Sequence, residues 1–294
     1  MISICFVFPY VGQGGVPVLF SQLANYLDTN KLARVSIVDY ADGSLFKLTN
    51  SSVKKIIYNP FHSTHIKSDF LVFQSMSPWS LYPGLKPSSS SRLFFWTLHP
   101  DNFKILSSPF IIKLTKYLPE NILRFFTCHL LSYLRQTTNI LLSKNSLAFM
   151  DLSTLSSSQQ RLDTYILDPV LLPICYSSLS KCRLPKSSFP AKVSSISFAW
   201  IGRLVSFKTP GLLTFATQLN NFAEYHRIII PFHVIGSGDS SISHIFSRFN
   251  HLQVTSIPDL SLEDLESYLL ANVNFAFAMG TSALVTSSLA IPTL

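Results

Sequence analysis

The chain has 294 residues, of which 47% are hydrophobic and only 13% are charged, so one or two domains with a sizeable core are expected. The low charge, the mean hydropathy of +0.31 and the 24 phenylalanines exclude a disordered or collagen-like chain. The net charge of +8 lies entirely in residues 1–185, whereas residues 186–294 are neutral, and this asymmetry predicts two domains with different partners.

Apolar runs and glycines alternate along the first half of the chain. Residues 2–8 form a short, β-rich apolar run, which predicts a buried strand. Gly12, Gly14 and Gly15 follow, and residues 16–27 then have the apolar spacing of a helix, so this stretch opens an α/β unit. Continuous apolar runs predict further parallel strands, buried on both faces, at residues 35–40, 55–58, 70–73, 93–98 and 146–150.

The second half repeats this pattern after a break. Residues 180–190 contain Pro185, Pro190 and a serine pair, which predict a linker. Ser261, with Asp264 three residues later, predicts the N-terminus of a helix. Strands are predicted at residues 197–201, 232–235, 252–257 and 274–278 and from residue 291, and helices at 210–224, 241–249, 261–270 and 281–289.

Strict alternation with a restart predicts an α/β fold of two doubly wound domains in tandem. Residues 1–180 are expected to form the first domain, 181–194 the linker and 195–294 the second domain. In such sheets ligands bind beyond the carboxyl ends of the strands. Glycines at these ends indicate either ordinary turns or a backbone that approaches a phosphate closely. The glycines at such positions are Gly12, Gly14, Gly15, Gly202, Gly236, Gly238 and Gly280.

The segment at residues 202–208, GRLVSFK, places two cations in a turn between a predicted strand and a predicted helix. Arg203 offers a planar fork of donors and Lys208 a point charge, and together they suit a diphosphate. A solvated pair of surface cations is the alternative.

Three segments of the second half carry a family resemblance: residues 202–208, VIGSG at 234–238, and GTSAL at 280–284 with LAIP at 289–292. In this order they resemble the second half of retaining GT-B glycosyltransferases of family 4 (glycosyl transferases group 1). That family includes many bacterial polysaccharide and lipopolysaccharide enzymes. The turn and helix at residues 14–27 resemble the start of its N-terminal domain.

The resemblance implies two Rossmann-like domains, with the acceptor on the first and a nucleotide-diphosphate sugar on the second. Arg203 and Lys208 match the pair that grips the diphosphate and stabilises the leaving group, so neither a metal ion nor another cofactor is expected. His99 corresponds to a histidine near the transferred sugar, or it is a structural histidine. The implied donor-binding residues are Gly14, Gly15, Gly202, Gly236, Gly280, Thr281, Ser282, Ala283 and Leu284.

The implied activity is transfer of a hexose to a glycan or lipid-linked acceptor with retention of configuration. Two family glutamates fall at Phe277 and Val285, whose side chains cannot accept a hydrogen bond from a sugar or ribose hydroxyl. Roughly 50–80 further residues would close the second sheet, so a C-terminally truncated domain without its last strand and helices is expected. The alternatives are a catalytically degenerate or truncated GT-B-like protein and, more weakly, a nucleotide-sugar epimerase of the same fold.

Residues 104–144 carry six basic residues against Glu120, interleaved with many apolar residues. This pattern predicts amphipathic helices at an anionic membrane surface, or a core-facing helix with a solvated basic face. The chain shows no signal peptide, no spanning apolar run, no CxxC pair and no nucleic-acid-binding motif. We therefore expect a cytoplasmic protein with free thiols, peripheral on the inner face of the plasma membrane, without a nucleic-acid partner.

Overall fold

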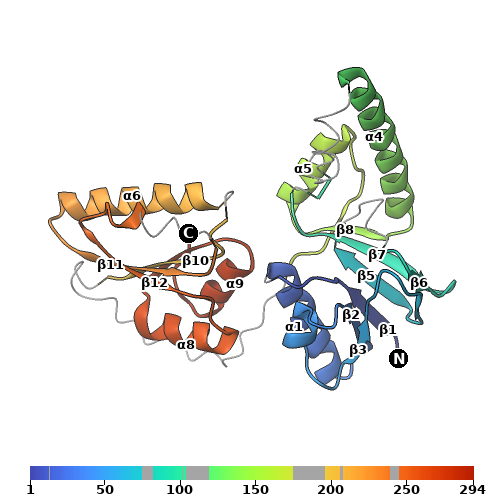
Figure 1. Cartoon of the computed structure of the whole chain (residues 1–294), viewed down its shortest axis with the longest axis horizontal. Helices are drawn as coiled ribbons and strands as arrows, with labels where there is room; N and C mark the ends of the chain where they lie inside the picture. Colours follow the sequence, from blue (N-terminus) through green and yellow to red (C-terminus); the bar gives the residue numbers. More distant parts are fainter. Residues whose placement is uncertain are drawn as a thin grey trace. The chain divides into compact units, whose positions relative to one another are not determined.

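The computed structural model describes residues 1–12, 14–74, 82–100, 102–103, 119–174, 196–205, 208–238 and 245–294. The chain divides into two units, Met1–Cys175 and Tyr176–Leu294, which Figure 1 colours along the sequence. Each unit is built on its own parallel sheet and is described by itself. The linker expected at residues 181–194 lies outside the described residues.

Seven parallel strands make the main sheet of the first unit. In spatial order they are β3 (Lys54–Ile57), β2 (Arg34–Asp39), β1 (Ser3–Val7), β5 (Phe70–Gln74), β7 (Arg92–Thr97), β8 (Leu147–Phe149) and β9 (Val170–Leu171). The chain builds outward from β1 to β3, returns to the other side of β1 and builds outward again, which is the order of a Rossmann-like sheet. A separate parallel pair consists of β4 (Thr64–Ile66) and β6 (Leu85–Pro87).

Helices cover both faces of this sheet, as Figure 1 shows. They are α1 (Gly15–Thr29), α2 (Ser44–Leu48), α4 (Glu120–Ser143) and α5 (Leu152–Leu162). Phe6 of β1 belongs to the same buried cluster as Phe20 of α1. The next residue, Val7, points to the other face and shares a cluster with Leu134 of α4 and Leu155 of α5. Successive side chains are thus buried on opposite faces, which accounts for the continuous apolar runs in the sequence.

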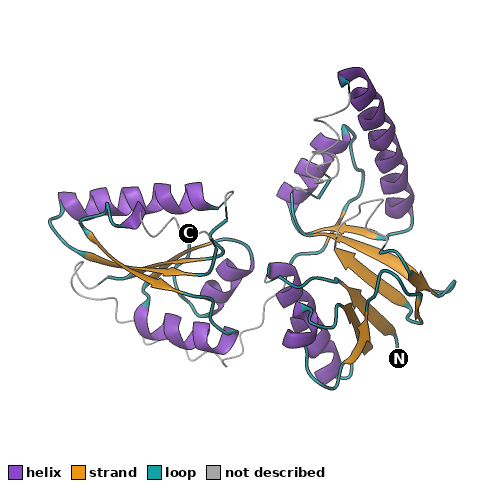
Figure 2. Cartoon of the chain, viewed as in Figure 1, coloured by secondary structure: helices purple, strands orange, loops and turns teal. Residues whose placement is uncertain are grey.

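The second unit has a parallel sheet of four strands. In spatial order they are β12 (Leu252–Ile257), β11 (Ile230–Ile235), β10 (Phe198–Ile201) and β13 (Phe275–Ala278). Its helices are α6 (Thr209–Tyr225), α8 (Leu262–Asn272) and α9 (Thr281–Ser288). Figure 2 shows α6 on one face and α8 on the other. Leu212 of α6 and Leu269 of α8 are both fully buried, each in the cluster of its own face.

The strands predicted between residues 2 and 278 are all present, and so are the helices predicted at residues 16–27, 210–224, 261–270 and 281–289. Ser261 Oγ accepts a hydrogen bond from the Asp264 N–H at 3.1 Å, which confirms the predicted cap. From residue 291 the structure has an isolated bridge between Thr293 and Ala276 of β13 and no strand, and the Leu294 N–H donates to the Ala276 carbonyl at 2.9 Å. The helix predicted at 241–249 lies partly outside the described residues. The elements that were not predicted are α2, α5, β4, β6 and β9.

Among the described residues, every helix is too short or too polar to cross a membrane. Cys5 is buried and Cys128 is exposed, and both are free thiols. Cys175 and Cys182 lie outside the described residues.

A buried carboxylate joins three segments at the end of β2. Asp39 Oδ1 accepts hydrogen bonds from the N–H groups of Tyr10 at 2.7 Å and Tyr40 at 2.8 Å, and Oδ2 accepts one from Leu45 at 2.7 Å. Burial raises the pKa of Asp39, although these hydrogen bonds act in the opposite direction. A Cβ at position 43 would stand 2.0 Å from the Asp39 carboxyl carbon, so only glycine fits there. The carboxylate therefore holds the loop after β1 against α2.

We expect Asp39→Asn to lower the free energy of unfolding by about 1–3 kcal/mol, because an amide nitrogen would face a backbone N–H instead of accepting from it. Asp42→Asn is the matched control, since Asp42 is exposed on the same loop. Urea-induced unfolding followed by circular dichroism measures both variants. Equal midpoints for Asp39→Asn and the wild type would contradict the role of the carboxylate.

Candidate functional site

Three loops of the second unit meet at one edge of its sheet. Gly202 and Arg203 follow β10, Gly236 follows β11 and Gly280 follows β13, and β10 lies between the other two strands. Parallel strands have their carboxyl ends at the same edge, so the structure brings these predicted positions together. Lys208 joins them as the residue that precedes α6.

Glycines let the loops after β10 and β11 pack backbone against backbone. Gly236 has a φ of 142°, and a Cβ there would stand 2.2 Å from the Gly202 carbonyl oxygen. Gly238 has a φ of 148°, and a Cβ there would stand 2.2 Å from the Leu204 carbonyl oxygen. The Gly202 N–H donates to the Ile235 carbonyl at 3.0 Å, so strand pairing continues into the loops. Gly236 is therefore required by packing, independently of any ligand.

Asp259, which follows β12, holds the loop after β11 from the other side. Its carboxylate accepts hydrogen bonds from the Ser237 N–H at 3.0 Å and from the Ser237 hydroxyl. A lone aspartate after a strand carries no motif, so no sequence pattern identified it.

The two cations of the turn lie close enough to influence each other. The Lys208 side chain folds back over Gly202, with Nζ 3.5 Å from the point where a Cβ of residue 202 would stand. Burial lowers the pKa of Lys208, and the positive charge of Arg203 lowers it further. Within the described residues, neither a hydrogen bond nor an ion pair engages the Arg203 guanidinium. This edge of the sheet therefore favours an anion.

The start of α9 adds backbone donors to the same edge. Gly280 has a φ of 65°, which turns the chain sharply between β13 and the helix. The N–H groups of Ala283 and Leu284 donate back to the Gly280 carbonyl at 3.1 and 3.4 Å. No side chain caps the helix, so the N–H groups of Thr281 and Ser282 are its uncapped first-turn donors.

The positions at which the family resemblance places glutamates are apolar and packed. Phe277, on β13, stacks on Trp200 of β10 with ring centroids 5.2 Å apart and planes 15° apart. Val285 is buried in the cluster on the opposite face of the sheet. Trp200 was not identified from the sequence, where it is one apolar residue of a predicted strand.

The predicted residues of the first unit also lie beyond the carboxyl ends of its strands. Gly14 precedes α1 and Gly15 is its first residue, after β1. His99 follows β7, and β5 separates β7 from β1. A Cβ at Gly12 would stand only 2.5 Å from the Tyr10 hydroxyl oxygen, so the Tyr10 ring packs against Gly12. The two glycines and the histidine thus share one edge of the first sheet.

No protein-family model matches the chain. No curated protein matches it. Among solved structures, WaaG, a glycosyltransferase involved in lipopolysaccharide biosynthesis, is similar with a TM-score of 0.54 and 13% sequence identity, over 99% of this chain and 80% of that chain. The chain has the GT-B fold.

Two further solved structures are similar at lower TM-scores. A glycosyltransferase from Rickettsia africae ESF-5 has a TM-score of 0.47 and 10% identity, over 99% of this chain and 78% of its own. MnaA from S. aureus, in a structure with UDP, has a TM-score of 0.48 and 11% identity, over 100% of this chain and 78% of its own.

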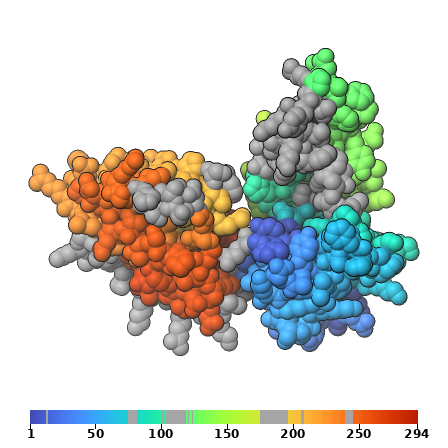
Figure 3. Space-filling view, in the orientation of Figure 1, coloured from blue at the N-terminus to red at the C-terminus, as the bar shows by residue number. Residues whose placement is uncertain are grey.

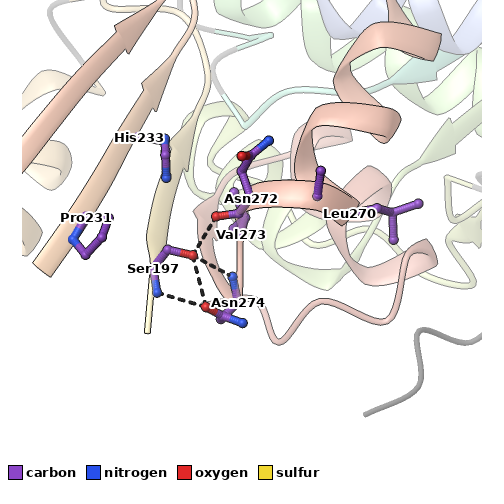
Figure 4. A pocket seen from close by; sticks show the side chains of 8 residues that line it. Ser197, Pro231, His233, Leu270, Asn272, Val273 and Asn274 are labelled. Atoms are coloured by element: carbon purple, nitrogen blue, oxygen red, sulfur yellow. Dashed lines mark hydrogen bonds between the residues drawn. The ribbon is translucent and has the colours of Figure 1, made fainter. Parts of the chain in front are cut away.

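A small pocket lies at the opposite edge of the sheet of the second unit, at the amino-terminal ends of its strands (Figure 4). It has a volume of about 380 Å³ and contains none of the predicted site residues. Ser197 donates from its N–H to Asn274 Oδ1 at 2.9 Å and from its hydroxyl to the Asn272 carbonyl at 2.6 Å. His233 Nδ1 and the Tyr268 hydroxyl lie 2.9 Å apart, and burial lowers the pKa of His233. These contacts tie α8 and β13 to the central strands.

Within the described part of the chain, no group of three or more His, Cys, Asp or Glu side chains is arranged to hold a metal ion.

The coupling of the two cations is testable by titration. Lys208 should titrate below its ordinary value of 10.5, and Arg203→Ala should move the midpoint upward because a neighbouring positive charge is removed. Burial remains in the variant, so the midpoint should stay below 10.5.

NMR of protein labelled with ¹³Cε-lysine measures this midpoint, with Lys208→Arg assigning the signal. Arg248→Ala is the control, since Arg248 is an exposed cation that precedes β12 at the opposite edge of the sheet. An unchanged Lys208 midpoint in Arg203→Ala would contradict the coupling.

Proposed function

We propose that this chain transfers a sugar from a nucleotide-diphosphate donor to a glycan or lipid-linked acceptor, without a metal ion and with retention of configuration. The observation that carries the proposal is the pair Arg203 and Lys208 beside Gly202, at the carboxyl edge of a sheet in the GT-B fold. Membership of family 4 and a role in lipopolysaccharide or other polysaccharide synthesis are part of this proposal. The likeness to WaaG supports it at the level of the fold.

The chemistry requires stabilisation of a departing diphosphate. The acceptor hydroxyl oxygen bonds to the anomeric carbon while the bond from that carbon to the phosphate oxygen breaks, and the hydroxyl proton passes to the leaving group. Negative charge grows on the diphosphate as this bond breaks. In this proposal Arg203, Lys208 and the uncapped N–H groups of Thr281 and Ser282 stabilise that charge more in the transition state than in the bound donor.

The first domain supplies the acceptor side in this proposal. Gly14 and Gly15, at the N-terminus of α1, present backbone to the donor, and His99 lies near the transferred sugar. The remaining proposed donor contacts, Gly236 and the first turn of α9 through Leu284, lie in the second domain. The apolar side chains of Phe277 and Val285 leave donor binding more dependent on the phosphates than on the ribose.

The Arg203→Ala variant tests the donor site. Losing a charge-assisted hydrogen bond costs about 1.5–3 kcal/mol, so we expect the affinity for a nucleoside diphosphate to fall roughly 10- to 100-fold. Calorimetry with UDP, ADP and GDP measures the affinity, and a panel of the corresponding nucleotide sugars measures hydrolysis. Arg248→Ala, an exposed arginine before β12, should bind as the wild type does.

Two outcomes would contradict the proposal in different ways. Failure of the wild type to bind any of the three nucleotides would contradict the donor site. Tight binding without hydrolysis or transfer of any donor sugar would instead favour a catalytically degenerate GT-B protein. Hydrolysis that is lost in Arg203→Ala and kept in Arg248→Ala supports the transferase.

We also propose that α4 places the protein on the inner, anionic membrane surface, as a cytoplasmic enzyme with a lipid-linked acceptor would require. Phe125 and Phe126 are 59% and 60% exposed, and Arg124 beside them is exposed. Leu134 of the same helix is buried, so the helix has one core-facing side and one exposed apolar side. Part of the α4 surface is visible in green in Figure 3. Residues 104–118 lie outside the described residues.

Co-sedimentation with vesicles tests the membrane surface. Wild-type protein should bind vesicles containing phosphatidylglycerol more tightly than neutral vesicles, and replacing Phe125 and Phe126 by serine should weaken binding at least about tenfold. Phe61→Ser is the control, because Phe61 is 90% exposed in another part of the first unit. Equal binding by the double variant and the control would contradict the assignment.

A further inference from the structure

Trp200 contributes a buried hydrogen-bond donor without a partner. Its side chain is only 1% exposed. No described residue accepts a hydrogen bond from its indole Nε1–H. An indole nitrogen can only donate, and a buried donor normally has an acceptor, so its orientation calls for an explanation.

The indole N–H and the Lys208 ammonium approach the same space. Trp200 Nε1 lies 3.8 Å, and Lys208 Nζ 3.5 Å, from the point where a Cβ of Gly202 would stand. Trp200 comes from β10 and Lys208 from the residue before α6, on the same face of the sheet. The position that a Cβ of Gly202 would take is thus bordered by two donors.

The chemistry of this space fits an anionic oxygen. An ammonium group and an indole N–H both donate, and Arg203 adds positive charge at the same turn. A phosphoryl oxygen accepts from several donors at once and carries the compensating charge. Its negative charge would oppose the effects of burial and of Arg203, which both lower the pKa of Lys208.

Neighbouring rings hold the indole in place. Trp200 stacks on Phe277, and Phe277 stacks on Phe215 of α6 with centroids 4.8 Å apart. A phenyl ring at position 277 cannot accept a hydrogen bond, whereas a carboxylate there could compete for the indole N–H. The aromatic stack therefore fixes the direction of the indole N–H and supplies no acceptor for it.

We propose that the Trp200 indole N–H donates to an oxygen of the donor diphosphate, as a third binding group beside Arg203 and Lys208. This inference rests on the proposed function and adds to it a residue that selects where the diphosphate lies. The indole is uncharged and held by packing. It therefore restricts the position of the diphosphate more strictly than a long, flexible cationic side chain does.

NMR of the full chain labelled with ¹⁵N-tryptophan tests this directly, with inorganic pyrophosphate and UDP as the probes. Trp200→Phe assigns the indole signal and keeps an aromatic ring in the stack. Trp96 is the internal control, since its Nε1–H already donates to the Leu172 carbonyl at 3.0 Å. We expect the Trp200 signal to move downfield and to exchange more slowly with solvent on binding, while the Trp96 signal stays in place.

Affinities provide the second readout. Trp200→Phe should weaken pyrophosphate binding about tenfold or more, and Trp96→Phe should leave it unchanged. Binding that leaves both the Trp200 signal and the Trp200→Phe affinity unaltered would overturn the inference while the proposed function stands. Failure of the wild type to bind either probe would contradict both. If Trp200→Phe does not fold, the movement of the wild-type signals alone decides.

Discussion

The carboxyl edge of the second sheet depends on one close contact between two stretches of backbone. Gly236 brings its Cα against the Gly202 carbonyl, nearer than any residue with a Cβ could come. This contact continues the β10–β11 pairing beyond the strands and directs the turn that carries Arg203. Lys208 precedes α6, and its side chain folds back over Gly202. The placement of Arg203 thus follows from glycine packing.

Desolvation and a neighbouring positive charge both disfavour the ammonium form of Lys208. Burial and the charge of Arg203 both lower the pKa of Lys208, so the ammonium form is less favourable than it would be in water. The uncharged donor of Trp200 lies beside it, also shielded from water. One anionic ligand would stabilise all three groups together. The buried charged group of the first sheet already has its partners, because the Asp39 carboxylate accepts hydrogen bonds from backbone N–H groups of the chain itself.

The strands were predictable because parallel strands buried on both faces need continuous apolar runs. Helix α5 was not, because its sequence LSTLSSSQQRL is rich in serine, which competes with helical hydrogen bonding. The structure stabilises it through the Asp151 cap on the Thr154 N–H, at 2.6 Å, and through the burial of Leu155 and Leu162. The strands β4, β6 and β9 have two or three residues each, too few for a periodic signal.

The sequence by itself determined the alternation of strands and helices, the glycine turns and the cations at positions 203 and 208, because these are local patterns within a few residues. Only the tertiary structure decided that Phe277 packs on Trp200, that Val285 lies in the core and that the indole N–H faces the space over Gly202. The contact between Phe277 and Trp200 depends on β13 lying beside β10, and that neighbour relation is set by the winding of the sheet rather than by either strand's own residues.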